Sequence, residues 1–549
     1  IWYVSFLFFM QKYFRVNYVK KQKIDERENA FSRIKKLIPK NKGESEKPYY
    51  ISEKELEKSG DGEIVSENIE INDKYISTLF ENDPMIISRR FFISENKVKC
   101  VAFFLDGMSN TDAVSEQFIK PLMTFSGDLS KEISAKKALE KIIYGGDIST
   151  ENKFSELVTA ILSGDTVIFI DGINEAFVAD TKKYSQRSVE EPYTEKTLKG
   201  PREGFVEDIM ANLSLLRRKL RTPDFKVRFF SFGRRSNTKT AVCYLDSVVN
   251  KKALSLLYER LENIDIDAVL DSNYLEEFIS DSPLSTFRTV GDTERPDTAA
   301  AKIAEGRIAV IVNGCPSVIT VPYLAIESFQ AADDYYTSSF YSSFMRVLRI
   351  LCYFMAVSLP GLFVALIAFH SYMLPSVLVM SFISARQGVP FPSIIECSAL
   401  LFAFEILRET ALRVPESIGQ PLSIVGALVL GDAAISARYT SAPMLIAVAV
   451  SCLAGLMVQS TKNSILFYRL LFLAFSSVLG AYGFLLALFI MTAHLFSLKS
   501  FGTDYFSYSP FSSPLKNKDY IVRAPWWAMV TFPEDITAQK YRQKAGRAK

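Results

Sequence analysis

The sequence predicts an α+β soluble N-terminal region of two similar duplicated subdomains, followed by an α-helical polytopic membrane domain. Charged residues are dense up to about residue 345, whereas long apolar runs dominate between 350 and 498. Two blocks of sequence recur within the charged part at nearly the same spacing. Several apolar runs reach about 20 residues, the length that crosses the roughly 30 Å hydrocarbon core of a bilayer. Buried helices of a large soluble core are the alternative to membrane spans.

Residues 1–62 are predicted to form an N-terminal extension and flexible linker. Residues 40–62 are charged and lack apolar periodicity, so they cannot bury enough apolar surface to fold. The apolar stretch 1–10 is too short to span a bilayer and has neither a basic start nor a small-residue cleavage site, so we expect no signal peptide. The soluble region should therefore stay cytoplasmic, and Arg346 and Arg349 before the first long apolar run agree with that orientation.

The recurring blocks predict one α+β subdomain at 63–195 and a second at 196–327. The corresponding residues are Asp106 and Asp246, Asn110 and Asn250, Gly164 and Gly306, Asp171 and Asn313, and Gly172 and Gly314. In the second block of each copy, a β-rich run ends at Asp-Gly or Asn-Gly and is followed by another β-rich run, which is typical of a hairpin. Chance similarity between apolar strands is the alternative, but two blocks at nearly one offset argue against it.

A helix is predicted in the segment that joins the two subdomains. Pro201, Glu203, Glu207 and Asp208 precede a helical pattern that basic residues close, an order that suits the helix dipole. Ligand contact by Arg202 and Glu203 and a capping role for them are both open.

The sequence does not predict an enzyme. It contains no GxxxxGK[ST], no GxGxxG after a strand, no GxSxG and no HExxH pattern. The two histidines, His370 and His494, lie in or beside apolar runs, and the six cysteines are scattered singly. Neither a zinc site nor a disulfide framework is indicated. We expect no catalytic residue, no metal ligand and no cofactor.

Residues 328–500 are predicted to form the membrane domain. The apolar runs at 350–369, 418–437, 442–458 and 470–498 qualify as spans. Between the first two, two apolar pieces of about a dozen residues are interrupted by Arg386, Gly388, Pro390 and Pro392. Four full spans plus a re-entrant pair are favoured, and six spans are the alternative. The run 470–498 exceeds one span and must tilt or bend, at Gly480 or Gly483. An even number of crossings leaves the basic tail, 501–549, in the cytoplasm.

One apolar segment is predicted to pack closely against a neighbouring helix. Gly419, Ser423, Ala427 and Gly431 recur at four-residue spacing, so they lie on one helical face. Small residues in this pattern let membrane helices approach closely. We therefore expect this face to pack in an oligomer.

Polar residues within the apolar region predict an ion path or a charged subunit interface. Gln420 and Asp432 lie beside the small-residue face, and Glu405, Arg408 and Glu409 share another helical face. An ionisable group at the bilayer centre costs roughly 2.5 to 3.5 kcal/mol unless it faces protein or water. The alternatives are that Asp432 reaches the interface and that the stripe is an interfacial ion-pair network. The candidate pore or gating residues are Glu396, Glu405, Arg408, Glu409, Glu416, Gln420 and Asp432.

Motifs along the chain resemble the A subunit of the spore germinant receptors, the GerA family of endospore-forming Bacillota. They are EEPYTEKTLKGPREGF, FGRRSNTKT, TERPD, IAEGRIAVIVNGCPSVITVP, DYY, GVPFPSIIE, FEILRETALRVPESIGQPLSIVGALVLGDAAISA and RAPWWAM. The likeness covers about 70–535. Arg438, Asp504 and the N-terminal extension depart from the family pattern, which puts detail at the pore end in doubt.

The resemblance implies a multi-pass subunit of the spore inner membrane whose N-terminal domain and C-terminal tail face the cytoplasmic core. It implies a transporter-like B subunit and a lipoprotein C subunit as partners, besides membrane lipid and further copies of the chain in a ring, and no nucleic acid. It implies a channel that releases ions and triggers germination when a nutrient binds. The soluble positions that match the family's strongest patterns are Gly200, Pro201, Arg202, Glu203, Gly204, Phe205, Glu305, Gly306 and Arg307. Alternatives are a paralogous sporulation subunit that amplifies ion release and a solute transporter, which would need inverted repeats.

Overall fold

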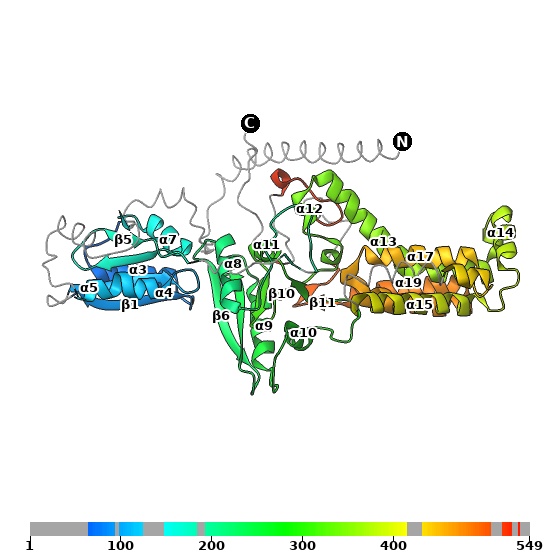
Figure 1. The fold of residues 1–549 in the computed structure, drawn as a ribbon, viewed down its shortest axis with the longest axis horizontal. Coiled ribbons are helices and arrows are strands. Elements are labelled where there is room, and N and C mark those ends of the chain that lie inside the picture. The colour runs from blue at the N-terminus through cyan, green and yellow to red at the C-terminus, as the bar shows by residue number, and fades with distance from the viewer. Residues whose placement is uncertain are drawn as a thin grey trace, which may run out of the picture.

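The computed structural model describes residues 64–93, 98–124, 148–183, 191–192, 194–413, 431–506, 519–529 and 536–537. These residues form an elongated molecule, with one β-sheet at one end, a second sheet in the middle and a helical bundle at the other end (Figure 1). The extension predicted for 1–62 lies outside the described residues. The predicted boundaries at 62, 195, 327 and 500 remain predictions.

The first sheet is antiparallel and has the strand order β1-β2-β4-β5-β3. Its strands are β1 (Ile86–Ile93), β2 (Val98–Leu105), β3 (Ile148–Glu151), β4 (Thr166–Ile170) and β5 (Ala176–Ala179). Helices α3 (Ile69–Leu79) and α7 (Phe154–Ser163) pack on one face, and the helical segment of α4 (Thr111–Ala113), η2 (Val114–Ile119) and α5 (Lys120–Thr124) packs on the other. Because both faces are covered, the central strands β4 and β5 are buried throughout.

The second sheet repeats this arrangement in the order β6-β7-β9-β10-β8. Its strands are β6 (Phe225–Phe232), β7 (Thr238–Leu245), β8 (Gly291–Thr293), β9 (Ile308–Val312) and β10 (Val318–Val321). The accompanying helices are α8 (Ile209–Lys219), α9 (Lys251–Glu262), α10 (Ser272–Ile279) and α11 (Pro296–Ala304). The hairpins that the Asp-Gly and Asn-Gly pairs predict are present as β4–β5 and β9–β10.

Equivalent hydrogen bonds support the internal duplication. The backbone N–H of Gly172 donates to the Glu67 carbonyl at 2.8 Å, and that of Gly314 donates to the Glu207 carbonyl at 2.7 Å. At the preceding position, the side chains of Asp171 and Asn313 accept from the first N–H groups of α3 and α8, each at 3.2 Å. The same turn thus anchors the same helix in both copies.

The two sheets share a hydrophobic core. Met85, Leu105 and Met108 of the first unit pack with Leu213 and Leu216 of α8 in one buried cluster. Beside it, the fully buried side chains of Asp83 and Arg217 form an ion pair. The two units are therefore held together by apolar packing and by a charge pair withdrawn from water.

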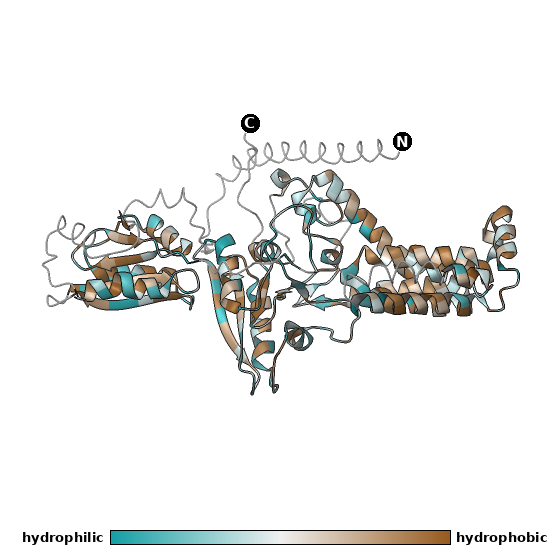
Figure 2. Ribbon diagram, in the orientation of Figure 1, coloured by the Kyte–Doolittle hydropathy of each residue, from teal (hydrophilic) through white to brown (hydrophobic). Residues whose placement is uncertain are grey.

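The chain leaves β10 through η3 (Ala325–Phe329) and α12 (Asp333–Tyr336) and enters α13 (Ser339–Ala368), a helix of 30 residues. The bundle also contains α15 (Ser393–Arg413), α17 (Ala442–Leu456), α18 (Lys462–Leu479) and α19 (Ala481–Ser497), with η4 (Ser371–Met373) and α14 (Ser376–Arg386) at the end remote from the sheets (Figure 1). Hydrophobic residues dominate this part (Figure 2). Among the described residues, Ser339–Ala368 and Gln459–Leu479 are long and apolar enough to cross a membrane.

The run 470–498 bends at Gly480, one of the two predicted positions, but the bend is a full reversal. The Phe472 and Phe484 rings lie 5.1 Å apart, and the Tyr468 hydroxyl lies 2.5 Å from Nδ1 of His494. Helices α18 and α19 are therefore antiparallel, and the prediction of one bent span is wrong. The second piece of the predicted re-entrant pair is also longer than expected, because α15 has 21 residues.

Candidate functional site

A cluster of charged side chains lies inside the apolar bundle. Arg469 of α18 is 3% exposed, and its Nη1 lies 3.6 Å from Oε1 of Glu405 on α15. Glu405 also forms an ion pair with Arg408 at 2.6 Å. Glu405 and Arg408, which were predicted to share a helical face, therefore form an ion pair, as the alternative of an ion-pair network expects, and Arg469 adds a third charge to it. Glu409 does not belong to this cluster, because it forms an exposed pair with Arg413 at 2.6 Å.

Arg469 also satisfies a backbone carbonyl that a proline leaves without a partner. Pro360 has no N–H, so the carbonyl of Ala356, four residues earlier in α13, accepts no helical hydrogen bond from it. That carbonyl accepts instead from Nε of Arg469 and from Oγ of Ser451 on α17, both at 2.8 Å. Arg469 thereby joins α13, α15 and α18. Sequence analysis missed this residue, although an arginine within a long apolar run is itself a signal of function.

Glu396 links the beginning of α15 to the beginning of α17. Its side chain is buried, and Oε1 accepts from Oγ1 of Thr440 at 3.0 Å, from the N–H of Ser441 at 2.6 Å and from Oγ of Ser441 at 2.7 Å. Arg386 approaches its other oxygen at 3.7 Å. Since Ser441 precedes α17, the carboxylate stabilises the positive end of that helix. This geometry supports an anchoring role for Glu396.

Two members of the predicted small-residue segment are described. Gly431 is half-buried, and a Cβ added there would meet only Leu445, at 3.6 Å. Asp432 is exposed. The other members, Glu416, Gly419, Gln420, Ser423 and Ala427, lie outside the described residues. Close packing of this face with another helix remains a prediction.

The motif Gly200 to Phe205 is the second half of a strap, residues 194–205, that crosses the second subdomain. A Cβ on Gly200 would lie 2.6 Å from the Tyr336 ring, and φ there is +109°, so a side chain does not fit. The Pro201 carbonyl accepts from the buried Arg295 at 2.7 Å. Gly204 and Phe205 are buried, and the Phe205 N–H donates to the Glu294 carbonyl at 2.8 Å. The strap therefore lies between the sheet and α12.

Arg202 and Glu203 do not cap the start of α8. Arg202 forms an exposed pair with Glu191 at 3.1 Å, and Glu203 lies 3.1 Å from Lys219 in the last turn of the helix. The cap is Asp208, whose side chain accepts from the Ala211 N–H at 2.9 Å. Asp208 directly precedes α8 in the chain, which is why its short side chain can reach the first free N–H groups.

Arg295 holds the strap in place and connects it to the helical part. Its guanidinium donates to the Glu195 carbonyl at 3.2 Å and to Thr197 at 3.0 Å, and it pairs with Asp297 at 2.9 Å. Farther along the strap, the Leu198 N–H donates to the Asp333 carboxylate of α12 at 3.1 Å. The strap thus contacts the segment that leads directly into α13.

The second soluble motif, Glu305 to Arg307, forms a buried charge network. Arg307 lies 2.7 Å from Glu305 and 2.9 Å from Glu327, which is also 3.2 Å from Lys302. Burial alone would raise the pKa of Glu327, but the two cations outweigh burial and hold the pKa below its usual value. Gly306 lies between the two charged residues with φ +94°. The network joins α11 to η3, on the path to the bundle.

A second charge network links α12 to α13. Asp334 binds Arg346 at 3.0 Å and Arg349 at 2.8 Å, and Arg346 also binds Asp519 of the C-terminal segment at 2.8 Å. Burial opposes ionisation of Asp334, but the arginines prevail and its pKa lies below the usual value. The Arg523 N–H donates to Ser343 Oγ at 3.0 Å. Arg346 and Arg349, whose positive charges agree with a cytoplasmic N-terminal region, are therefore also ion-pair partners of Asp334.

A groove of about 900 Å³ opens between the two subdomains. Glu81 and Asp83 line it from the first unit, and Arg228, Tyr244 and Tyr258 line it from the second. A change in the relative position of the two units would alter its width. None of the predicted site residues lines it.

The fold and these clusters define a class of protein in which a duplicated α+β region is joined by buried ion pairs to an apolar helical bundle. Within the described residues, no group of His, Cys, Asp and Glu is placed to hold a metal ion. The chain belongs to the GerA family of spore germination proteins, since the family model described as Bacillus/Clostridium GerA spore germination protein matches residues 74–535. The family resemblance of the sequence motifs is thereby confirmed.

Curated relatives agree with this assignment. The chain is 36% identical to spore germination protein KA of Bacillus subtilis over 83% of this chain and 85% of the relative, and 32% identical to spore germination protein A1 of the same organism over 81% and 92%. It is also 36% identical to a B. subtilis protein named uncharacterized membrane protein YfkQ, over 87% and 93%. A crystal structure of the N-terminal domain of the A subunit of the Bacillus megaterium spore germinant receptor GerK3 matches at 28% identity with a TM-score of 0.38, covering 48% of this chain and 97% of that one.

Proposed function

We propose that this chain is the channel-forming and signal-transducing A subunit of a nutrient germinant receptor. Membership of the GerA family and the names of the germination-protein relatives support this role. The observation that carries the proposal is the cluster of Arg469, Glu405 and Arg408 within the apolar bundle. An ionisable side chain in a membrane domain costs free energy, and such side chains commonly mark ion pathways or pair with other charges.

The contacts suggest how a signal reaches this cluster. The strap contacts α12, and the Asp334 network joins α12 to the beginning of α13. The same helix α13 carries Ala356, whose carbonyl accepts from Arg469. A nutrient that favours one arrangement of the soluble region would shift the population of α13 positions. Because Arg469 contacts both α13 and Glu405, such a shift would alter the charged cluster.

The proposal includes an assembly and a location. The chain would form a ring of like subunits through the face of Gly419, Ser423, Ala427 and Gly431, together with a transporter-like B subunit and a lipoprotein C subunit. It would lie in the spore inner membrane as a multi-pass protein, with the N-terminal domain and the tail on the core side. A membrane protein is named among its relatives, and two of its described helices are long and apolar enough to span a bilayer.

Exchange of Glu405 for glutamine tests the role of the cluster. Glu405→Gln removes the charge that pairs with Arg408 and Arg469, so nutrient-triggered potassium release from spores should change in rate or in ion selectivity. The matched control is Glu409→Gln, which removes the same charge from the same helix at an exposed pair and should leave release unchanged. Normal potassium release by Glu405→Gln spores, with the subunit present at its usual level, would remove Glu405 from the ion path.

A further inference from the structure

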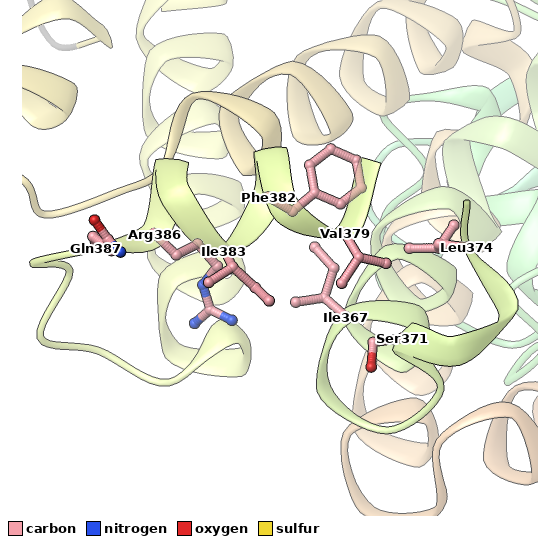
Figure 3. Close-up of a pocket in the computed structure, with 8 residues that line it drawn as sticks. All are labelled: Ile367, Ser371, Leu374, Val379, Phe382, Ile383, Arg386 and Gln387. Carbon is pink, nitrogen blue, oxygen red and sulfur yellow. The ribbon is translucent and has the colours of Figure 1, made fainter. Parts of the chain in front are cut away.

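An apolar pocket with a volume of about 310 Å³ lies at the end of the bundle remote from the sheets. It is lined by the end of α13, by η4 and by α14 (Figure 3). Its apolar lining residues are Ile367, Leu374, Val379, Phe382 and Ile383, and its polar ones are Ser371, Arg386 and Gln387. In Figure 3, Arg386 and Gln387 lie at one end of the pocket, whereas Ser371 and Leu374 lie at the other.

Helix α14, which forms one wall, is apolar on its outer side as well. None of its described residues is buried. The side chains of Val377, Met380 and Leu378, none of which lines the pocket, are 78%, 65% and 45% exposed. A helix that is hydrophobic on all sides requires an apolar environment. Helix α14 lies at the end of α13, which is one of the two described helices long and apolar enough to span a bilayer. If the chain is a membrane protein as proposed, the surrounding lipid supplies the apolar environment.

Arg386 carries a positive charge, and the hydrogen-bond donors of its guanidinium are only partly satisfied within the protein. Its Nε is buried without a hydrogen-bond partner and lies 3.7 Å from Oε2 of Glu396. Its Nη2 reaches the Phe391 carbonyl only at 3.5 Å. The other oxygen of Glu396 already accepts the hydrogen bonds of Thr440 and Ser441. Because Nε is buried, the donors open to an anionic group are those of Nη1 and Nη2, and among the described residues their one hydrogen-bond partner is the Phe391 carbonyl.

We propose that this pocket binds an anionic phospholipid, with one acyl chain against the apolar lining and the phosphate on Arg386. An amphiphile with a negative head matches both ends of the pocket, since the guanidinium recognises phosphate through paired N–H donors. The exposed apolar side of α14 would lie in the surrounding lipid. The inference rests on the proposed membrane location, but it does not depend on ion conduction.

Lipid binding to the full chain, purified in a neutral detergent, tests this inference. Native mass spectrometry would compare phosphatidylglycerol with phosphatidylcholine of the same acyl chains, and inorganic phosphate would be added as a competitor. We expect phosphatidylglycerol to bind in preference, and Arg386→Gln to weaken its binding about tenfold because a charge-assisted contact is lost. Val379→Trp, which fills the pocket, should abolish binding of both lipids.

Two variants serve as controls, and thermal unfolding checks that every variant is folded. Arg413→Gln removes an exposed arginine of α15, and Val377→Trp adds the same bulk to α14 outside the pocket, so neither should alter lipid binding. If Val379→Trp does not fold, the comparison of Arg386→Gln with Arg413→Gln decides. Equal binding of the two lipids, equal binding by Arg386→Gln, or displacement of the lipid by inorganic phosphate would each overturn the inference. Ion release is not part of this measurement, so its failure would leave the proposed function standing.

Discussion

Individual arginines and carboxylates connect parts of this molecule that are distant in the sequence. Glu405 and Arg408 are neighbours on one helix, so their pairing follows from their spacing. Arg469 reaches Glu405 from another helix, and spacing along the chain carries no information about such a contact. For the same reason the sequence marks Arg202 and Glu203 as a motif but does not show that Arg295 holds the strap that contains them.

Removal of one partner of the buried Asp83–Arg217 pair should lower the free energy of unfolding strongly, whereas replacement of both partners should lower it little. Arg217→Met leaves an uncompensated buried carboxylate and should destabilise the protein by about 3 to 5 kcal/mol. In the double variant Asp83→Asn/Arg217→Met no charge is left, so most of the loss should be recovered. Thermal unfolding of the full chain in detergent measures both, with Arg234→Met at an exposed pair as the control. A double variant as unstable as Arg217→Met would contradict the charge explanation.

Glu195 predicts a dependence of stability on pH. Burial raises the pKa of its carboxyl above the usual value of 4.5, although hydrogen bonds from Thr293 and the Glu294 N–H oppose the change. A raised pKa in the folded state stabilises the fold at low pH, and this contribution is lost as the pH rises through the folded pKa. Glu195→Gln mimics the protonated form, so it should gain stability over the wild type at pH 7 and lose this advantage near pH 4.5. A difference in unfolding temperature that stays constant with pH would contradict this reading.

At the scale of elements, the sequence predicts the tight turns of the hairpins, but it does not predict how a long apolar run folds. The Asp-Gly and Asn-Gly pairs predict the hairpins β4–β5 and β9–β10, because a tight turn is set by the residues within it. The run 470–498 contains no Asp, Glu, Lys or Arg, so its length alone predicts one bent span. The structure instead reverses at Gly480, where φ is +60°. A single glycine in an apolar run indicates a bend but does not give its angle.

Substitution of Gly480 tests the reversal between α18 and α19. A Cβ there would lie 2.7 Å from Cε1 of His370 and 2.9 Å from Cβ of Phe369, and φ is positive. Gly480→Ala should therefore destabilise the bundle by about 1 to 3 kcal/mol, seen as a lower unfolding temperature in detergent. The control is Val478→Ala, two residues earlier in α18, whose side chain is 73% exposed. Equal unfolding temperatures for Gly480→Ala and the wild type would show that the reversal does not need glycine.

At the scale of the whole molecule, hydropathy predicts the division into a charged α+β region and an apolar helical bundle, because the composition changes over long stretches of the chain. The duplication of the soluble region was also visible, since residues at equivalent turns are alike. The contacts that connect the α+β region to the helical bundle were not visible in the sequence. They run through the strap, the Glu327 and Asp334 networks and α13. The strap contact joins residues 135 positions apart, and the charge networks join residues of different elements that no sequence periodicity relates. Five of the predicted pore and packing residues lie outside the described part.

The most direct test of the account is ion flux through the purified chain in liposomes, together with its companion B and C subunits and a nutrient. If the charged cluster belongs to a channel, the reconstituted assembly contains several copies of the chain and releases potassium when the nutrient is added, and Glu405→Gln changes that release whereas Glu409→Gln does not. A chain that remains monomeric and ion-tight under these conditions would contradict the proposed function.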